Sequence, residues 1–395
     1  MSAKIKELIE KEYKRQMGEI NLIASENISS KAVQEVVGTH LAHKYAEGYP
    51  GKRYYGGCEV VDEIENHARD LAKKIYNAEH ANVQPHSGSS ANMGVYLALL
   101  KPGDTVLAMS LDAGGHLTHG ANVSFSGMLY NFVHYGLDEN GVLDYADLEA
   151  KAREHKPKII IAGGSAYSLV IDFARIEKVA REVNSIFMVD MAHFAGIVAA
   201  GLHPNPMDWA DVVTTTTHKT LRGPRGGMIL SREKYAAAID KAIFPGTQGG
   251  PLMNEIAGKA VCFEEALTPE YKTYMQRVLS SAKHLSDKLQ SNGIKVISGG
   301  TETHLLLIDL SDQEKSGKQV QEELGKLRIV VNKNKIQGDK RGAIQTSGIR
   351  IGTPFISNFD GVTPAVLDEL ANVMTAVIKG DKVPSMELLN KVFKA

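Results

Sequence analysis

Short apolar runs alternate with helical patterns over the middle of the chain, and this alternation constrains the fold more than any other feature. The apolar runs typical of strands lie at residues 104–110, 158–163, 186–190, 211–217 and 227–230. Helical patterns separate them at residues 91–100, 146–155 and 176–183. Strands that alternate with helices predict an α/β fold with a mainly parallel sheet. In such sheets ligands bind at the carboxyl ends of the strands.

The chain has 395 residues, too many for one hydrophobic core, so we expect more than one domain. Thr268 and Pro269 interrupt two helical patterns, and a mixture of strands and helices follows them. Its elements are expected at residues 275–289, 294–297, 304–310, 329–332 and 364–379. The sequence therefore predicts an N-terminal helical arm at residues 1–16, a large α/β domain at 17–270 and a small α+β domain at 271–395.

Charge, hydropathy and cysteine content argue against several classes of function. The formal net charge is −1, which gives a nucleic acid little to bind. The apolar runs are short and interrupted, so we expect no membrane span, and the first residues lack the apolar stretch of a secretory signal. The two cysteines, Cys58 and Cys262, make neither a disulfide framework nor a zinc site and favour a reducing cytoplasm.

Lys219 follows the β-branched run at 211–217 and precedes a glycine-rich turn at 223–227. Most lysines are solvated surface charges, and that is the alternative for Lys219 taken alone. At a strand end among threonine hydroxyls, however, its amine is placed to meet a small carbonyl ligand. A deprotonated lysine condenses with an aldehyde to give a Schiff base, and pyridoxal phosphate is the aldehyde that proteins most often bind in this way.

Two other segments fit the same cofactor. Asp190 ends an apolar run, where a carboxylate could keep a pyridinium nitrogen protonated; without Lys219, a helix N-cap would be an equal alternative. Ser87, Gly88 and Ser89 precede a helical pattern, and a helix N-terminus favours a phosphate. The alternative for this segment is an ordinary serine N-cap.

A glycine-flanked loop at residues 114–120 holds two histidines, His116 and His119. The loop lacks the other clustered ligands that zinc requires. A histidine ring stacked on a flat cofactor is the functional hypothesis, and a hydrogen-bonded loop histidine is the alternative.

Residues 45–59 form a segment rich in tyrosine, glycine and charge without helical or strand periodicity. We call it the 45–59 loop; loops of this composition are often functional. Its Glu47 is a candidate proton carrier. Arg350 lies in another apolar run, where it could hold a substrate carboxylate in a bidentate contact. A structural salt bridge is the alternative for Arg350, and the better one from this run alone.

Together these segments closely resemble serine hydroxymethyltransferase. The matching strings lie in family order at residues 22–27, 44–59, 86–89, 114–120, 189–193, 201–206, 214–227, 244–253 and 347–354. The strings at 44–59 and 214–227 are the most specific, and the resemblance covers nearly the whole chain. Residues 336–345 and 355–361 depart from the usual family pattern.

The resemblance implies a fold-type I, aspartate-aminotransferase-like pyridoxal-phosphate enzyme that works as a homodimer or a dimer of dimers with shared active sites. It implies reversible transfer of the serine hydroxymethyl group to tetrahydrofolate, which leaves glycine and 5,10-methylenetetrahydrofolate. Serine, glycine and a reduced folate are the implied ligands, with no metal.

Carried over by position, the resemblance makes Lys219 the Schiff-base lysine and pairs Asp190 with the ring nitrogen. Catalytic roles fall to Lys219, Glu47, His116, Tyr55 and Thr216. Cofactor contacts fall to Gly88, Ser89, His116, Ser165, Asp190, His193, Thr216, His218, Lys219, Tyr45 and Arg225, with Tyr55, Gly249 and Gly250 reaching over from the neighbouring subunit. Substrate and folate contacts fall to Ser25, Glu47, Tyr54, Leu111, Gly115, Leu117, Asn334 and Arg350. Among these, Glu47 acts from the partner subunit on the hydroxymethyl and folate protons.

One rival hypothesis keeps the same scaffold, and a second belongs to a different class of protein. A folate-independent aldolase or transaldolase acting on 3-hydroxy amino acids would keep Lys219, Asp190 and Arg350, whereas Glu47, Tyr45 and Asn334 favour the folate enzyme. A catalytically idle protein that binds RNA would have no need of this residue set, and the near-neutral charge argues against it.

Overall fold

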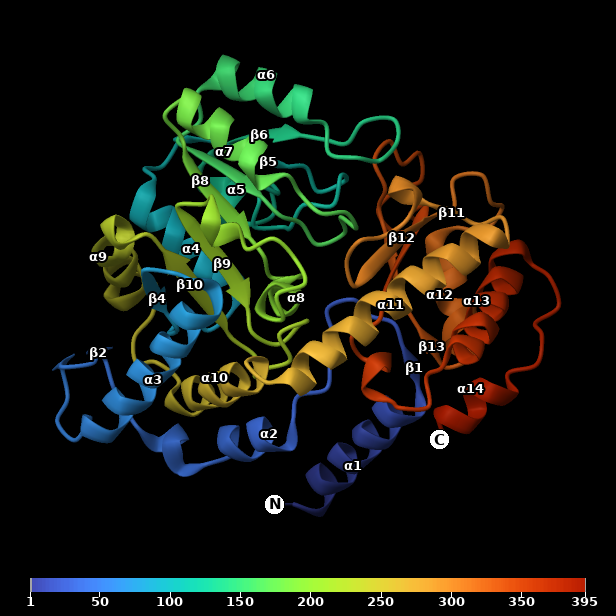
Figure 1. Cartoon of the computed structure of the whole chain (residues 1–395), viewed down its shortest axis with the longest axis horizontal. Coiled ribbons are helices and arrows are strands. Elements are labelled where there is room, and N and C mark those ends of the chain that lie inside the picture. The colour runs from blue at the N-terminus through green and yellow to red at the C-terminus, as the bar shows by residue number, and fades with distance from the viewer. Residues whose placement is uncertain (1, 395) are drawn as a thin grey trace. The chain divides into compact units, whose positions relative to one another are not determined.

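The computed structural model describes residues 2–394, and the contacts between Cα atoms divide the chain into two compact units. One unit is Asn27–Met275, and the other combines Met1–Glu26 with Gln276–Ala395. Figure 1 labels their helices and strands, and each unit is described by itself.

A seven-stranded sheet forms the centre of the Asn27–Met275 unit, in the order β4-β10-β9-β8-β7-β5-β6 (Figure 1). Its strands are β4 (His80–Asn82), β5 (Thr105–Met109), β6 (Asn131–Tyr135), β7 (Ile159–Ala162), β8 (Ile186–Asp190), β9 (Val212–Thr216) and β10 (Gly227–Ser231). The strands from β6 to β9 in this order pair in parallel, while β10 is antiparallel to both β9 and β4. The predicted α/β class with a mainly parallel sheet is confirmed.

Helices cover the sheet and its edges in this unit. They are α2 (Lys31–Val37), α3 (Glu59–Tyr76), α4 (Gly88–Leu99), α5 (Phe125–Leu129), α6 (Tyr145–His155), α7 (Phe173–Glu182), α8 (Ala195–Ala199), α9 (Glu233–Lys241) and α10 (Met253–Ala266), with shorter turns η1 (His40–His43), η2 (Pro206–Asp208) and η3 (Ala242–Thr247). Two short strands, β2 (Gly48–Tyr49) and β3 (Lys52–Arg53), form a hairpin within the 45–59 loop.

Alternate residues of the central strands form two buried faces. One face joins α4 and α9 in a single apolar cluster that includes Val95, Val106, Ile159, Ile161, Met188, Val212 and Ile239. The strand residues between these positions are also fully buried, namely Leu107, Ile160 and Phe187, and α6 and α7 contact the same strands. Burial on both faces explains why these strands are continuously apolar in the sequence.

In the central sheet, the strands β4 and β6 were not predicted from the sequence, and neither was the start of α4. β4 has only three residues, and β6 lies at the sheet edge with a polar residue at its start and another in its middle, so neither resembles a buried strand. α4 begins at Gly88 rather than at 91, because Ser87 is its N-cap and shares a reciprocal capping box with Ser90. Residues 242–247, expected in part as loop, form η3.

The second unit has its own sheets and core. Its antiparallel sheet has the order β11-β12-β15-β14, and a separate parallel pair joins β1 to β13. The strands are β1 (Ile20–Asn21), β11 (Lys295–Val296), β12 (Leu305–Asp309), β13 (Ile329–Val330), β14 (Asn332–Asn334) and β15 (Gly348–Gly352). The helices are α1 (Ala3–Gly18), α12 (Gly317–Lys326), α13 (Pro364–Lys379) and α14 (Glu387–Val392), with turns η4 (Ile297–Gly299) and η5 (Ile356–Asn358), while α11 (Pro269–Ser291) contains the boundary between the units. The predicted helix at 364–379 is confirmed.

Residues 17–26, which we expected in the large domain, group with the C-terminal segment. The amide of Ile20 donates to the carbonyl of Arg328 and that of Leu22 to Val330, each at 2.8 Å. That residues 1–16, 17–270 and 271–395 form separate domains stays a prediction. None of the helices within residues 2–394 has the length and hydropathy of a membrane span.

Gly163 follows β7 at the carboxyl edge of the sheet, and its substitution tests how closely the backbone packs there against β8. Its φ is +107°, and a Cβ there would lie 2.1 Å from the carbonyl oxygen of Asp190. Gly163→Ala should therefore lower the free energy of unfolding by about 3 kcal/mol or more, since a steric clash adds to backbone strain. Urea unfolding of the full-length protein measures this loss.

Gly103→Ala is the matched control. Its φ is +85°, but no atom lies within 4 Å of an added Cβ. Only the backbone strain of about 1–2 kcal/mol applies there. Equal losses for the two variants would contradict close packing of Gly163 on β8.

Candidate active site

A hollow of about 190 Å³ opens at the carboxyl edge of the seven-stranded sheet. It is lined by Ser87, Gly88, Ser89, His116, Gly164, Ser165, Asp190, Ala192, His193, Thr216, His218 and Lys219. Nine of the residues to which the resemblance gives a site role lie among these: Gly88, Ser89, His116, Ser165, Asp190, His193, Thr216, His218 and Lys219. They come from the ends of β5, β7, β8 and β9 and from the start of α4, as the position rule for α/β sheets predicts.

The N-terminus of α4 forms one wall of the hollow. Ser87 and Ser90 cap the helix, with Ser90 N–H donating to Ser87 Oγ at 3.1 Å and Ser87 N–H to Ser90 Oγ at 2.8 Å. Gly88 and Ser89 are the first two helical residues, and their amides have no acceptor within the helix. The hydroxyl of Ser89 and the positive end of a 12-residue helix therefore face a place suited to an anion.

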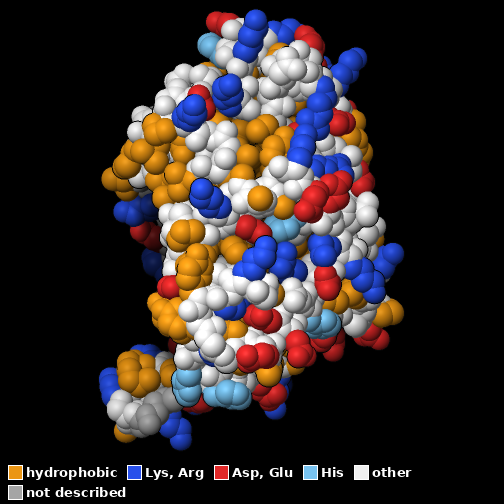
Figure 2. All heavy atoms as spheres, turned by 90° about the vertical axis from the view of Figure 1, so that its left-hand side faces the viewer, with side chains coloured by type: hydrophobic (Ala, Val, Ile, Leu, Met, Phe, Trp, Pro, Cys, Tyr) orange, Lys and Arg blue, Asp and Glu red, His pale blue; other side chains and the backbone are white. Residues whose placement is uncertain are grey.

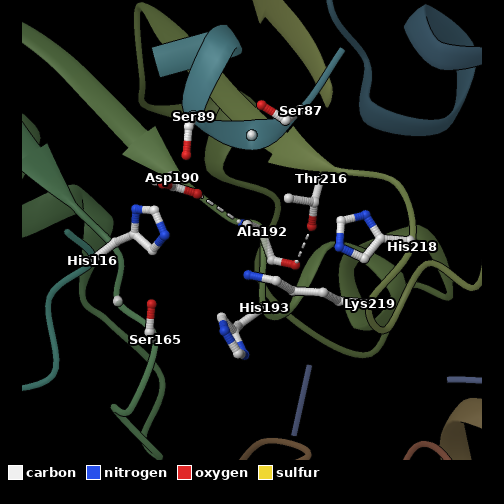
Figure 3. Close-up of a pocket in the computed structure, with 12 residues that line it drawn as sticks. Ser87, Ser89, His116, Ser165, Asp190, Ala192, His193, Thr216, His218 and Lys219 are labelled. Atoms are coloured by element: carbon white, nitrogen blue, oxygen red, sulfur yellow. Dashed lines mark hydrogen bonds between the residues drawn. The ribbon is translucent and has the colours of Figure 1, made fainter. Parts of the chain in front are cut away.

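Asp190 ends β8 as a carboxylate held by donors from three other segments. Asn92 Nδ2 donates to its Oδ2 at 2.9 Å, and His119 Nε2 lies 3.1 Å from the same oxygen. Ala192 N–H donates to Oδ1 at 3.1 Å, a contact that Figure 3 marks with a dashed line. The N-cap of the following helix α8 is Phe194, so Asp190 is not a helix cap.

The contacts of Asp190 keep it ionised in spite of its burial. Burial alone would raise the pKa of Asp190, but the hydrogen bond and charge of His119, together with His116 and Asn92, hold that pKa well below its usual range. A carboxylate that stays charged at all ordinary pH values can stabilise a protonated ring nitrogen beside it.

Lys219 lies three residues beyond Thr216, the last paired threonine of β9, and is only 9% exposed. Figure 3 shows its amine pointing into the space bounded by His116, Asp190 and His193. Contacts of the neighbouring backbone fix the turn: Asn27 Nδ2 donates to the Lys219 carbonyl at 2.9 Å, and Gly223 N–H donates to Thr217 O at 2.7 Å. This lysine is thus a buried amine inside the hollow and not a surface charge.

Thr216 and His218 flank the lysine on the same strand end. Thr216 Oγ1 donates to Ala192 O at 3.3 Å, which joins the ends of β9 and β8 (Figure 3). Arg225 Nη1 lies 3.4 Å from His218 Nε2, and burial, then the charges of Arg225 and Lys219, lower the pKa of His218 to about 4. His218 is therefore neutral at physiological pH.

A second group of predicted site residues gathers on the 45–59 loop. The rings of Tyr45 and Tyr55 lie 5.1 Å apart, and the charge of Glu47 raises the pKa of Tyr45. The two glycines Gly249 and Gly250 lie against the loop, since added Cβ atoms would be 3.2 Å from Glu47 Oε1 and 3.3 Å from Tyr45 Cε1 respectively. The ring of Tyr54 contacts Phe244 at 5.5 Å. None of the described residues that line the hollow belongs to this second group.

The remaining predicted residues are described within their own units. Leu111 and Leu117 are about half exposed on the segment after β5, next to Gly115. In the second unit, Arg350 on β15 donates from Nε to Asn332 Oδ1 at 3.0 Å, and burial lowers its pKa to about 10. Asn334 ends β14, and Ser25 is half-buried on the segment that packs against the end of β15.

Sequence reasoning missed His119 and Asn92, which hold Asp190. His119 is almost fully buried, and Asn92 also accepts from Thr214 Oγ1 at 2.6 Å, so it connects α4 to β9. His116 and His119 lie three residues apart in one loop, and the sequence predicts a role for His116 alone. A polar residue on the buried face of α4 was the signal that could have indicated Asn92.

The neutral state of His218 predicts an acid sensitivity of the fold. Between the ordinary histidine pKa of 6.5 and the folded value of about 4, the unfolded chain binds a proton that the folded chain does not. The contribution of neutral His218 to the free energy of unfolding is therefore fully present above pH 6.5. It is lost as the pH falls toward 4, by about 3 kcal/mol at most. In His218→Asn, the free energy of unfolding should fall less between pH 7 and pH 4.5 than in the wild type.

Urea unfolding of cofactor-free protein at the two pH values measures this difference. His40→Asn, at an exposed position, serves as the control and should keep the wild-type pH dependence. A wild-type pH dependence in His218→Asn would show that His218 is protonated in the folded protein.

The model of the family serine hydroxymethyltransferase matches residues 1–374 of the chain. Enzymes of this family are fold-type I proteins that use pyridoxal phosphate and transfer the hydroxymethyl group of serine to tetrahydrofolate, leaving glycine. The match confirms the predicted fold type, cofactor and transferase activity, and it gives no specific support to the aldolase alternative. With most of its length matched and its strand-end residues gathered in one hollow, the chain belongs to the serine hydroxymethyltransferase family.

Proposed function

We propose that the hollow holds pyridoxal phosphate and that the residues predicted from the sequence act there as the family resemblance implies. The observation that carries this proposal is the pairing, within one hollow, of a buried lysine amine with an aspartate whose carboxylate accepts hydrogen bonds from Asn92, His119 and Ala192. Few side-chain sets serve both an aldehyde and a ring nitrogen, whereas this pair suits both ends of a pyridoxal ring.

The residues present fit the cofactor in three respects. The amides of Gly88 and Ser89 suit a phosphate at a helix N-terminus. Asp190 suits the ring nitrogen, and the imidazole of His116 suits a place against the ring. Bound there, pyridoxal phosphate supplies an electron sink for amino-acid carbanions.

Each side chain then has a limited task. Lys219 offers an amine nucleophile inside the hollow. Asp190 holds a proton at the ring nitrogen, with His119 and Asn92 fixing its orientation. His218, kept neutral, adds no second positive charge beside Lys219.

Arg350 is proposed to bind the carboxylate of serine or glycine, with Ser25 nearby. A bound carboxylate would stabilise the charged guanidinium, whose pKa burial lowers. Leu111, Gly115, Leu117, Asn334 and Tyr54 are proposed to contact the folate.

Glu47, Tyr55, Gly249 and Gly250 are proposed to act in the site of a second copy of the chain, so that a homodimer, alone or paired into a tetramer, shares its active sites. In support, Tyr54 is 75% exposed, and Tyr45 and Tyr55 are about half exposed. The face that carries β2, α3 and α9 also shows several apolar patches among its charges (Figure 2). Exposed aromatic side chains are enriched at protein interfaces. A cytoplasmic location without nucleic-acid or membrane partners is proposed from charge and cysteine content.

Lys219→Ala tests the cofactor assignment. Without the amine the protein should lose repeated turnover, since no nucleophile remains to hold and release the cofactor. Borohydride reduction of the loaded wild type, followed by peptide mass spectrometry, should locate the cofactor on the peptide that contains Lys219. A cofactor on any other lysine would overturn the assignment of the hollow.

Glu47→Gln tests the proton carrier and separates the transferase from the aldolase alternative. Glutamine keeps the size of the side chain but cannot change its protonation state, so folate-dependent turnover of serine should fall by about 10²-fold or more. Binding of serine and cofactor should persist, and cleavage of a 3-phenylserine without folate should fall much less. An equal fall of both rates would assign Glu47 a structural role.

A further inference from the structure

Lys259 is a buried charged residue to which the proposed chemistry gives no role. It lies on α10, is 2% exposed, and is one of the largest fully buried side chains of the protein. Its Nζ donates to three backbone carbonyls: Val83 O at 2.6 Å, Gly227 O at 2.9 Å and Pro85 O at 3.2 Å. An ammonium has three donors, so all three are used.

These carbonyls belong to the two backbone segments that meet behind the N-terminus of α4. Val83 and Pro85 lie between β4 and Ser87, and Gly227 is the first residue of β10. Gly227 N–H also donates to Pro85 O at 2.9 Å, and an added Cβ at Gly227 would lie 2.2 Å from Ser87 O. The amine thus connects the segment that leads into Ser87–Ser89 with the strand on which that turn rests.

The backbone at Gly226 packs closely against the side chain of Lys259. A Cβ at Gly226 would lie 2.4 Å from its Cε, so the glycine-rich turn after Lys219 passes directly over its side chain. Burial lowers the pKa of Lys259 to about 7, while three carbonyl acceptors favour the ammonium, the only form that can donate to all of them. The positive charge acts on the same segment, because it contributes, after burial, to the lowered pKa of His86.

We propose that Lys259 is a positioning residue for the phosphate end of the cofactor. Its hydrogen bonds to the carbonyls of Val83, Pro85 and Gly227 hold these two segments together. They thereby fix the turn in which the amides of Gly88 and Ser89 bind the phosphate. This inference rests on the proposed function, since it requires the phosphate to bind at the N-terminus of α4. Lys259 acts through that turn and touches neither the ring nor the substrate.

Binding of two probes to cofactor-free, full-length protein tests the role. Pyridoxal 5′-phosphate and pyridoxal differ only in the phosphate. The dissociation constant of pyridoxal divided by that of pyridoxal 5′-phosphate, called the ratio below, therefore isolates what the turn contributes to phosphate binding. In Lys259→Met, affinity for pyridoxal 5′-phosphate should fall by about tenfold, and that for pyridoxal should stay within about twofold. Equal falls for both probes, or no fall for either, would overturn the proposal.

A second variant and a second readout guard against failure to fold. Lys259→Gln keeps an uncharged donor and should lower the ratio by less than methionine does. Amide hydrogen exchange of cofactor-free Lys259→Gln should rise at residues 86–90 and not at β5. Unchanged exchange at 86–90, with the ratio of the wild type, would also overturn the proposal.

Ile256→Ala is the matched control, because Ile256 is fully buried on the same helix. It should lower stability and leave the ratio unchanged; a changed ratio would show that any damage to α10 has this effect and would overturn the specific role of Lys259.

Ser89→Asp separates the two proposals, since a carboxylate at this helix start is compatible with the helix but repels a phosphate. If Ser89→Asp lowers the ratio and Lys259→Met does not, only the positioning role fails. If Ser89→Asp leaves the ratio unchanged, the phosphate lies elsewhere and the proposed function fails with it.

Discussion

The buried carboxylate of Asp190 is the constraint on which the rest of the site depends. A charge removed from water is costly unless hydrogen-bond donors surround it. Here the donors come from α4, from the loop after β5 and from the turn after β8, as Asn92, His119 and Ala192. Asn92 in turn accepts from Thr214 on β9. One carboxylate therefore fixes the relative positions of four segments, and the hollow that contains Lys219 exists where those segments meet.

The sequence predicted the elements that have a regular pattern of apolar residues. It missed the elements that form only through contacts with other segments. β8 and α13 have the predicted bounds because each has a regular apolar pattern that ends at a polar residue or a glycine. β4 has three residues with no alternation, and only pairing with β10 makes it a strand. The start of α4 depended on the reciprocal contacts of Ser87 and Ser90, which spacing alone could not show.

The candidate site was predictable to the extent that its residues end strands. Asp190, Thr216 and Lys219 share one edge because parallel strands place their carboxyl ends together. His119 and Asn92 escaped because they act on Asp190 and not on a ligand. Lys259 escaped for a different reason: it occupies a helix whose other inward positions are apolar, where a lysine resembles an ordinary exposed residue until its three carbonyl acceptors are seen.

Hydrogen bonds through Gln84 and Gln248 connect the two groups of predicted site residues in the Asn27–Met275 unit. Gln84, on the segment that leads to Ser87, donates from Nε2 to Gly48 O at 2.9 Å and to Glu65 Oε1 at 2.8 Å, and Glu65 also binds Arg53 at 2.6 Å. Gln248 connects the same segment to the turn that holds Gly249, because it donates to Gln84 O at 3.0 Å and accepts from His86 N–H at 2.9 Å. Each of these hydrogen bonds limits how far the segments that it joins can move apart, although Gln84 Oε1 accepts no hydrogen bond from the described residues. The segment that presents Ser87–Ser89 to the hollow and the 45–59 loop that carries Glu47 therefore cannot be positioned independently of each other.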